Sequence, residues 1–267
     1  MSDTSEIWTG EAALYDQVRP SPPPVLVDIL TQLINTPQPA LVVDLGSGTG
    51  LSTMMWGELA QRVIGIEPNA DMRNQAIHNA AKHPHVKHIA FQEGVSQQTG
   101  LPDGSVDIVT CSQSFHWMEP TSTLAEVARI LRPGGLFAAY DYSWPPALGW
   151  EVEQTYQEVD ARFDALLCER ELEQNLQRWP KEKHLERMRE SGRFRFTREL
   201  LLHHIEYGNA ERFMGMIMTN RYSHEFKLNT ITEEEIGLTR LREAAQRYIG
   251  SETLPWYFSY KVRLGIK

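Results

Sequence analysis

The sequence predicts an α/β fold built around a doubly wound, Rossmann-like parallel sheet, and three observations support this. In residues 41–45 four apolar residues surround one acid, which is typical of a buried strand. A glycine-rich turn, 46–50, follows at once and leads into a helix start. A second short apolar strand, 63–67, also ends in an acid. Folds of this kind bind ligands outside the carboxyl ends of their strands.

The glycine-rich turn has the sequence Gly46-Ser47-Gly48-Thr49-Gly50. Glycine permits backbone conformations that other residues avoid and lets a ligand approach the main chain closely. The turn also places backbone N–H groups and the positive end of a helix beside that ligand. We therefore expect a cofactor to contact this segment at Asp44, Gly46, Ser47, Gly48 and Gly50.

Glu67 lies 23 residues after Asp44, at the end of the second strand. In doubly wound folds an acid at this position accepts hydrogen bonds from ribose hydroxyls, so Glu67 predicts a nucleoside-containing cofactor. A dinucleotide fingerprint requires the spacing G-x-G-x-x-G, whereas here the third glycine, Gly50, comes one residue early and Leu occupies position 51. This spacing disfavours a nicotinamide dinucleotide, although an oxidoreductase remains an alternative.

Segment 42–50 resembles motif I of the class I S-adenosylmethionine (SAM)-dependent methyltransferases. Segments 101–109, 115–117 and 131–135 support the resemblance in the same order, and together they are similar to the small-molecule group that includes trans-aconitate methyltransferases. The resemblance covers about residues 8–142. It implies SAM as cofactor and a seven-stranded sheet whose last strand inserts antiparallel between strands five and six. It also implies a helical insertion after strand five that covers the active site.

The resemblance further implies two regions that contact the cofactor. Tyr15 and Arg19 belong to a Tyr-x-x-x-Arg-Pro segment that folds over SAM in related enzymes, although a packing aromatic and a surface charge are the alternative. Val95 and Ser96 occupy the loop that contacts adenine in the family. The usual acid is absent there, so backbone groups of these two residues are the expected contacts.

The loop 112–118 follows the apolar strand 106–111 and should border the reactive end of the cofactor. We expect Gln113 to contact the cofactor and His116 to be the catalytic candidate, either as a base or as a hydrogen-bond donor to substrate. Packing beside Trp117 is the alternative for His116. The expected substrate-contacting residues are Trp117, Tyr142, Trp144 and Arg221.

Hydrophobic periodicity places the remaining elements. Helices are expected at about 25–34, 52–60, 123–131, 150–172, 210–218 and 230–249, and another opens after Pro68-Asn69 and carries Met72, Ala76 and Ile77. Further strands are expected at 86–92, 136–140, 194–205 and 256–264. The chain then divides into an N-terminal cover with a SAM-binding core (1–144), a helical lid insertion (145–193), and a segment that completes the sheet and adds pocket helices (194–267).

Composition restricts the partners. A formal net charge of −9 and a pI near 5.5 disfavour nucleic acid. No run of eighteen apolar residues is present and residues 1–7 do not resemble a signal peptide, so we expect a cytoplasmic protein without a membrane partner. The two cysteines and the histidines at 78, 83, 85 and 88 predict no metal site. The oligomeric state is left open.

These observations together predict a SAM-dependent methyltransferase that acts on a small molecule, with a carboxylate acceptor weakly favoured. The alternatives are a catalytically inactive SAM-binding protein, since this fold can keep a cofactor site without chemistry, and the nicotinamide-dependent oxidoreductase.

Overall fold

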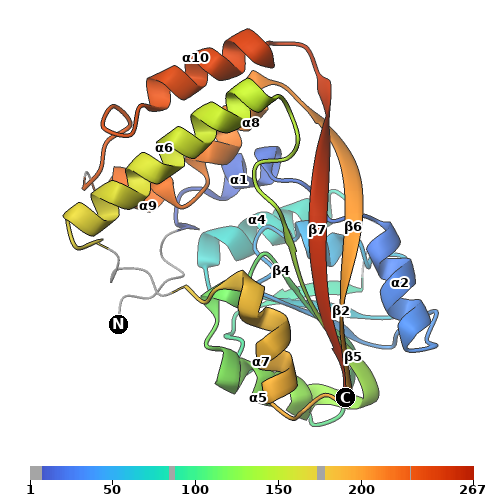
Figure 1. Cartoon of the computed structure of the whole chain (residues 1–267). Helices are drawn as coiled ribbons and strands as arrows, with labels where there is room; N and C mark the ends of the chain where they lie inside the picture. The colour runs from blue at the N-terminus through green and yellow to red at the C-terminus, as the bar shows by residue number, and fades with distance from the viewer. Residues whose placement is uncertain (1–7, 84–87, 173–177, 229) are drawn as a thin grey trace.

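A computed structural model describes residues 8–83, 88–172, 178–228 and 230–267. In this part of the chain, seven strands form one sheet in the order β3-β2-β1-β4-β5-β7-β6 (Figure 1). The strands are β1 (Val42–Leu45), β2 (Val63–Ile66), β3 (Ile89–Gln92), β4 (Val106–Ser112), β5 (Leu131–Tyr142), β6 (Phe196–Gly208) and β7 (Leu254–Ile266). The pairs from β3 to β5 are parallel, whereas β7 runs antiparallel to both β5 and β6. The predicted α/β sheet and the inserted antiparallel last strand are confirmed.

Helices cover both faces of the parallel part of the sheet. The helices are α1 (Ala12–Val18), α2 (Val25–Leu33), α3 (Leu51–Met54), α4 (Ala70–Ala81), α5 (Pro120–Ile130), α6 (Trp150–Glu169), α7 (His184–Glu190), α8 (Ala210–Met218), α9 (Tyr222–Lys227) and α10 (Leu238–Tyr248). On one face Leu26 and Leu30 of α2 pack with Trp56 against the strands. On the other face α5 and Met188 of α7 pack against alternate residues of the same strands. Each central strand is therefore buried on both sides, which explains its continuous run of apolar residues.

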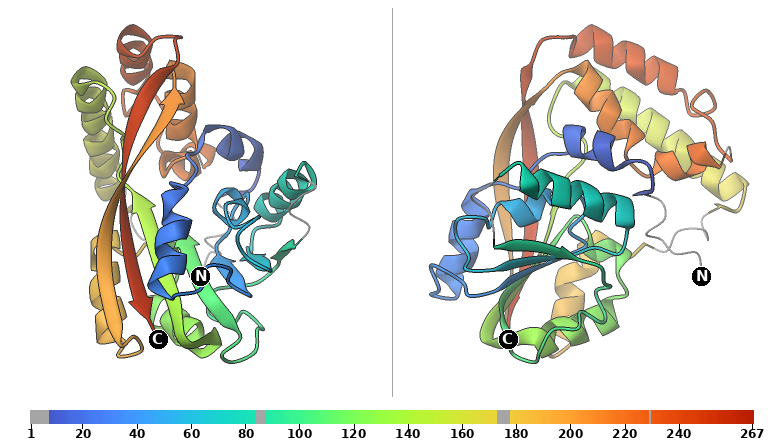
Figure 2. Two further views of the ribbon diagram at one scale, coloured as in Figure 1. Left: turned by 90° about the vertical axis from the view of Figure 1, so that its right-hand side faces the viewer. Right: turned by 180° about the vertical axis from the view of Figure 1, so that it is seen from behind.

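A third group of helices, α6, α8, α9 and α10, packs on the extended ends of β6 and β7 (Figure 1). Trp256, Phe258 and Tyr260 alternate along β7 and direct their side chains into this apolar cluster. Helix α1 contacts α8 in this group and α4 in the other part of the molecule (Figure 2). The N-terminal segment therefore lies between this third group of helices, called the upper helices below, and the parallel half of the sheet.

The predicted insertion 145–193 does not form one structural unit in its described residues. Helix α6 joins the upper helices, whereas α7 packs against β6, β7 and α5 on one face of the sheet. The two helices separate because their apolar faces meet different cores: Val159 and Phe163 lie in the upper cluster, while Met188 lies in the sheet cluster.

Two predicted helices differ from the observed ones, and some short observed helices were not predicted. The last helix begins at Leu238 and not near Thr230, because Gly237 adopts a φ of +74° and Glu235 folds back to accept from the Thr232 amide. The helix predicted at 52–60 is shorter in the structure: α3 ends at Met54, and single hydrogen-bonded turns follow as far as Ala60. Helix α1 was not predicted; it has seven residues and no side-chain cap, so its local signal is weak. The tail 1–7, His85 and the start of the third predicted strand lie outside the described residues.

Candidate functional site

The glycine turn lies between β1 and α3, at the carboxyl end of the parallel strands. Gly46 has a φ of +65°, and a Cβ there would lie 2.7 Å from Cβ of Ser114, the residue that follows Gln113 after β4. A side chain at position 46 is therefore excluded both by backbone conformation and by space. Gly48 also has a positive φ, of +55°, but no atom lies within 4 Å of an added Cβ. The turn is thus tightly packed at Gly46 and open at Gly48.

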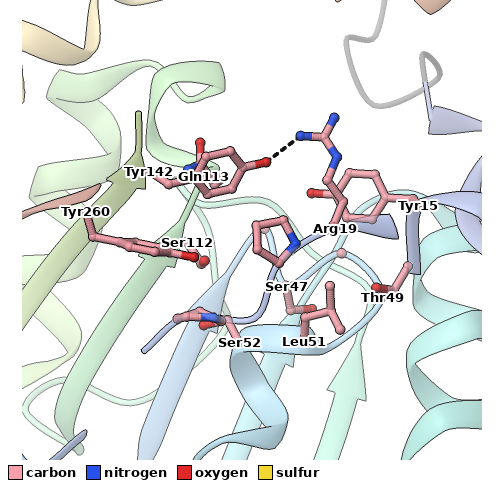
Figure 3. Close-up of a pocket in the computed structure, with 14 residues that line it drawn as sticks. Tyr15, Arg19, Ser47, Thr49, Leu51, Ser52, Ser112, Gln113, Tyr142 and Tyr260 are labelled. Atoms are coloured by element: carbon pink, nitrogen blue, oxygen red, sulfur yellow. Dashed lines mark hydrogen bonds between the residues drawn. The ribbon is translucent and has the colours of Figure 1, made fainter. Parts of the chain in front are cut away.

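A small cavity opens beside this turn (Figure 3). Its lining residues are Tyr15, Arg19, Pro20, Pro22, Gly46, Ser47, Gly48, Thr49, Leu51, Ser52, Ser112, Gln113, Tyr142 and Tyr260. They come from the N-terminal cover, the glycine turn, the end of β4 and the paired strands β5 and β7. Seven of the residues predicted to contact ligands are brought together here: Tyr15, Arg19, Gly46, Ser47, Gly48, Gln113 and Tyr142.

Three buried polar atoms of this cavity fit a polar cofactor. The Ser47 and Thr49 hydroxyls and Nε2 of Gln113 have no hydrogen-bond partner within the described residues. Buried polar groups in proteins are nearly always paired, so these atoms are suited to bind a polar ligand. Sequence reasoning missed Ser52, which lies two residues after Gly50 in α3. It also missed Ser112 and Tyr260, because only the pairing of the strands brings them beside the glycine turn.

Glu67 lies beside the glycine turn without lining the cavity. One of its carboxylate oxygens accepts from the Gly48 amide at 2.9 Å, and the other accepts from the Asn69 amide at 2.9 Å. Burial raises the pKa of Glu67, while these two hydrogen bonds oppose that shift. A carboxylate has about four acceptor positions, so both oxygens keep capacity for ribose hydroxyls. Glu67 therefore fixes the turn and can still serve the predicted cofactor contact.

Asp44 is fully buried and its carboxylate joins three elements. It accepts at 2.7 Å from the hydroxyls of Thr53 in α3 and Thr110 in β4. Burial raises the pKa of Asp44 to about 6. Asp44 and Gly50 do not line the cavity, and the cofactor contacts predicted for them remain predictions. The side-chain bonds of Asp44 hold the strand from which the turn begins.

Arg19 closes the cavity from the N-terminal side. Its guanidinium donates to the Tyr142 hydroxyl at 2.6 Å (Figure 3). It also donates to the Thr219 hydroxyl at 3.3 Å and to the Thr219 carbonyl oxygen. It also lies 4.8 Å from the ring centre of Tyr15. Within the described residues no carboxylate pairs with Arg19, and it is the charged member of the cavity lining there. The cavity therefore has a positive charge to offer a ligand.

His116 and Trp117 lie in a short 3-10 helix, η2 (Phe115–Trp117), outside the cavity lining. Nδ1 of His116 is 3.8 Å from Asp141 and has no hydrogen-bond partner among the described residues. Burial lowers the pKa of His116 well below its ordinary value, and the positive charges of Lys181 and Arg178 lower it further. The imidazole is therefore neutral near pH 7. The Trp117 ring contacts the Arg178 guanidinium, 4.2 Å from the ring centre.

Four other predicted contacts lie outside the cavity lining. Val95 is 40% exposed, and the Ser96 hydroxyl bonds that of Thr123 at 2.8 Å. Trp144 stacks on Phe213 in the upper helices with the ring centres 5.6 Å apart. Arg221 pairs with Asp160 at 3.3 Å and with Asp164. The backbone contacts predicted for Val95 and Ser96 and the substrate contacts predicted for Trp144 and Arg221 remain predictions.

Within the described ranges, no group of three or more His, Cys, Asp or Glu side chains is placed to hold a metal ion. No helix in those ranges is long and apolar enough to cross a membrane. Cys111 is buried and Cys168 is exposed.

Comparison with known proteins shows which domain family contains the residues of this site. Residues 43–139, which include the glycine turn, Glu67 and the loop after β4, match the model of a methyltransferase domain family. Residues 43–139 form a methyltransferase domain. An uncharacterized methyltransferase of Mycobacterium tuberculosis is 34% identical over 152 residues, which cover 57% of this chain and 58% of that protein. The aligned region thus spans little more than half of that relative.

Solved structures agree with this domain at the level of the fold. A candidate type II methyltransferase from Anaeromyxobacter dehalogenans superposes with a TM-score of 0.63 over 93% of this chain and 97% of that one, at 23% identity. The YcgJ protein of Bacillus subtilis gives a TM-score of 0.55 over 90% and 97% of the two chains, at 17% identity. The fold of this chain, over about nine-tenths of its length, therefore recurs in these two structures.

Proposed function

We propose that the protein transfers the methyl group of SAM to a small molecule, and that the accepting group is a carboxylate. SAM supplies an electrophilic methyl group on a sulfonium. The residues that would hold SAM are those of the glycine turn, with Glu67 on the ribose and the cavity polar atoms on the methionine part. The observation that carries the proposal is this cavity at the carboxyl end of β1 and β4, whose charged lining residue is Arg19.

The charge around the predicted reactive end supports an anionic acceptor. Arg19, Arg178 and Lys181 all lie close enough to His116 to lower its pKa. Such a set of positive groups attracts an anion and disfavours an amine cation. The resemblance to trans-aconitate methyltransferases points in the same direction.

The state of His116 supports the same acceptor. An imidazole whose pKa lies well below neutrality is a weak base, and general-base catalysis is most effective when the pKa is near the working pH. A carboxylate is already ionised at neutral pH and needs no base, whereas an alcohol does. We therefore assign His116 an orienting role, as a neutral hydrogen-bonding group near the acceptor.

Orientation of the two reactants and exclusion of water would accelerate such a reaction. An in-line displacement requires the nucleophile to be held behind the methyl group and opposite the leaving sulfur, and orientation of this kind contributes up to about 7–11 kcal/mol in favourable cases. Arg19 and Tyr142 cover the cavity from the side of the upper helices. The cover excludes water and restricts the orientation of both reactants.

The test is transfer of labelled methyl from SAM to a panel of small carboxylic acids, phenols and amines. We expect label in a product that mild base hydrolyses, as a methyl ester would be, and none when the same acid is supplied with its carboxyl group blocked. Label in a base-stable product would replace the carboxylate by a hydroxyl or amine acceptor. SAM binding without transfer to any acceptor would instead favour the inactive SAM-binding protein.

A further inference from the structure

Gln113 has an unusual backbone at the rim of the cavity. It follows the last residue of β4 and has a φ of +53°, a region that non-glycine residues seldom occupy. The backbone N–H of Gln113 donates to the Tyr140 carbonyl oxygen at 3.0 Å. The side-chain hydroxyl of the next residue, Ser114, donates to the Leu45 carbonyl oxygen at 2.7 Å. These bonds hold a costly conformation in place, which is common at ligand sites. The side chain of Gln113 consequently lines the cavity (Figure 3).

Lys181 reaches this side chain from the segment after α6. It lies in a short 3-10 helix, η4 (Lys181–Lys183), and its Nζ is 2.6 Å from Oε1 of Gln113. The same Nζ is 3.1 Å from Asp141, which the Arg263 guanidinium also contacts at 3.0 Å. Asp141 therefore anchors the ammonium group, and the ammonium group holds the amide of Gln113.

The contact determines which way the amide points. A lysine ammonium has three donors and no acceptor, so it can bind only the oxygen of a glutamine amide. The nitrogen, Nε2, must then point away from Lys181. It is buried, and no described residue accepts a hydrogen bond from it. Gln113 thus presents a donor, and not an acceptor, to the cavity.

We propose that Lys181 is a positioning residue that orients the Gln113 amide to donate to the carboxylate of the methionine part of bound SAM. Gln113 shares its cavity with Gly46, Ser47 and Gly48, so a ligand held by the glycine turn lies within the same space. Arg19 lines that space with no described acidic partner, and a carboxylate would complement both donors. This inference rests on the proposed use of SAM but not on the identity of the acceptor.

The test compares binding of SAM with binding of decarboxylated SAM, which lacks only that carboxylate, by calorimetric titration. Lys181→Met keeps the aliphatic length and removes the ammonium. We expect it to weaken SAM binding by about 10-fold, the size of a lost hydrogen bond to a charged group, and to change binding of decarboxylated SAM by less than about 2-fold. Lys181→Arg, which also offers donors alone, should retain most of the affinity.

Two further variants control the comparison. Lys183→Met makes the same chemical change two residues away at an exposed position, and should leave both affinities unchanged. Gln113→Glu keeps the shape of the side chain but replaces the donor by an acceptor, and should weaken binding of SAM more than that of its decarboxylated form. Thermal unfolding of each variant shows that it is folded.

Two results would overturn the proposal. One is unchanged SAM affinity in Lys181→Met. The other is an equal loss for SAM and decarboxylated SAM, since a general disturbance of the loop affects both. A wild-type protein that binds SAM but gives no methylated product would count against the proposed function and leave this comparison intact. A wild-type protein that does not bind SAM would overturn both.

Discussion

The guanidinium of Arg19 donates to the hydroxyl of Tyr142 at 2.6 Å, across 123 positions of the chain. This bond joins the N-terminal cover to the end of β5, and the bonds from Arg19 to Thr219 extend the connection to the end of α8. One side chain thus connects three parts of the fold at the mouth of the cavity.

The first prediction concerns this connection. Arg19→Lys keeps the charge but loses the planar fork that reaches Tyr142 and Thr219 together. We expect SAM affinity to fall by about 10-fold, together with faster proteolysis of the segment before Pro20, because the cover is held less firmly. The same change at Arg198, exposed on β6, should alter neither property. Equal proteolysis in the two variants would contradict the connecting role of Arg19.

The second prediction concerns Gly46, with Gly192 as the matched control position. The two glycines have φ values of +65° and +63°, but only at Gly46 would an added Cβ meet another atom within 4 Å. Gly192→Ala should cost about 1–2 kcal/mol of stability from backbone strain alone. Gly46→Ala should cost about 1–3 kcal/mol more, from the clash with Ser114, and should also weaken SAM binding. Denaturant unfolding and SAM titration measure both effects, and equal stability losses would refute the packing argument.

The third prediction concerns Glu67. Glu67→Ala removes the acceptors for the Gly48 amide and for the expected ribose hydroxyls, so SAM affinity should fall by about 1–3 kcal/mol. Glu93→Ala removes an equally charged side chain from a nearby exposed position, where it pairs with Arg73, and should leave SAM affinity unchanged. Isothermal titration distinguishes these outcomes. Full affinity in Glu67→Ala would remove Glu67 from the cofactor site.

The fourth prediction separates the two roles considered for His116. If a neutral His116 only orients the acceptor, His116→Gln should raise KM and reduce kcat by less than about 10-fold, since an amide can also form hydrogen bonds. Loss of a general base typically costs about 100-fold or more in rate. Steady-state kinetics with the acceptor acid measure this difference. A loss of kcat on that larger scale would restore the assignment of His116 as a base.

The fifth prediction concerns the dependence of stability on pH. Burial lowers the pKa of His184 from 6.5 to about 4, with Asp141 opposing and Arg263 adding to the shift. As the pH falls below 6.5, the unfolded chain binds a proton that the folded chain does not, so the free energy of unfolding decreases. Between about pH 7 and pH 5 the titration of His184 should lower the free energy of unfolding by about 2 kcal/mol.

The variant His184→Leu removes that titration while filling a similar volume. The difference in unfolding free energy between wild type and variant should therefore shift by about 2 kcal/mol in favour of the variant as the pH falls over this range. Denaturant unfolding at several pH values gives this difference. A difference that does not change with pH would mean that His184 is protonated equally in both states.

The sequence by itself determined the elements whose signal is local. A buried strand reads as a short apolar run, and the glycine turn and Glu67 lie within 24 residues of one another, so their chemistry follows from spacing. The strands, the helices α2, α4 and α8, and the residues of the turn could be predicted for this reason. The position of β7 between β5 and β6 came from resemblance, since no local pattern specifies a long-range antiparallel pairing.

Only the tertiary structure decided which side chains enclose the cavity. The antiparallel register sets Tyr142 opposite Tyr260, and the side chains of opposed residues lie on the same face of a sheet. The contact of Lys181 with Gln113 spans 68 positions and depends on where the chain returns after α6. Bringing residues so far apart in the chain into contact costs conformational entropy, and the packing of whole helices and strands offsets this cost. Local propensity does not, so no short segment of the sequence predicts such contacts.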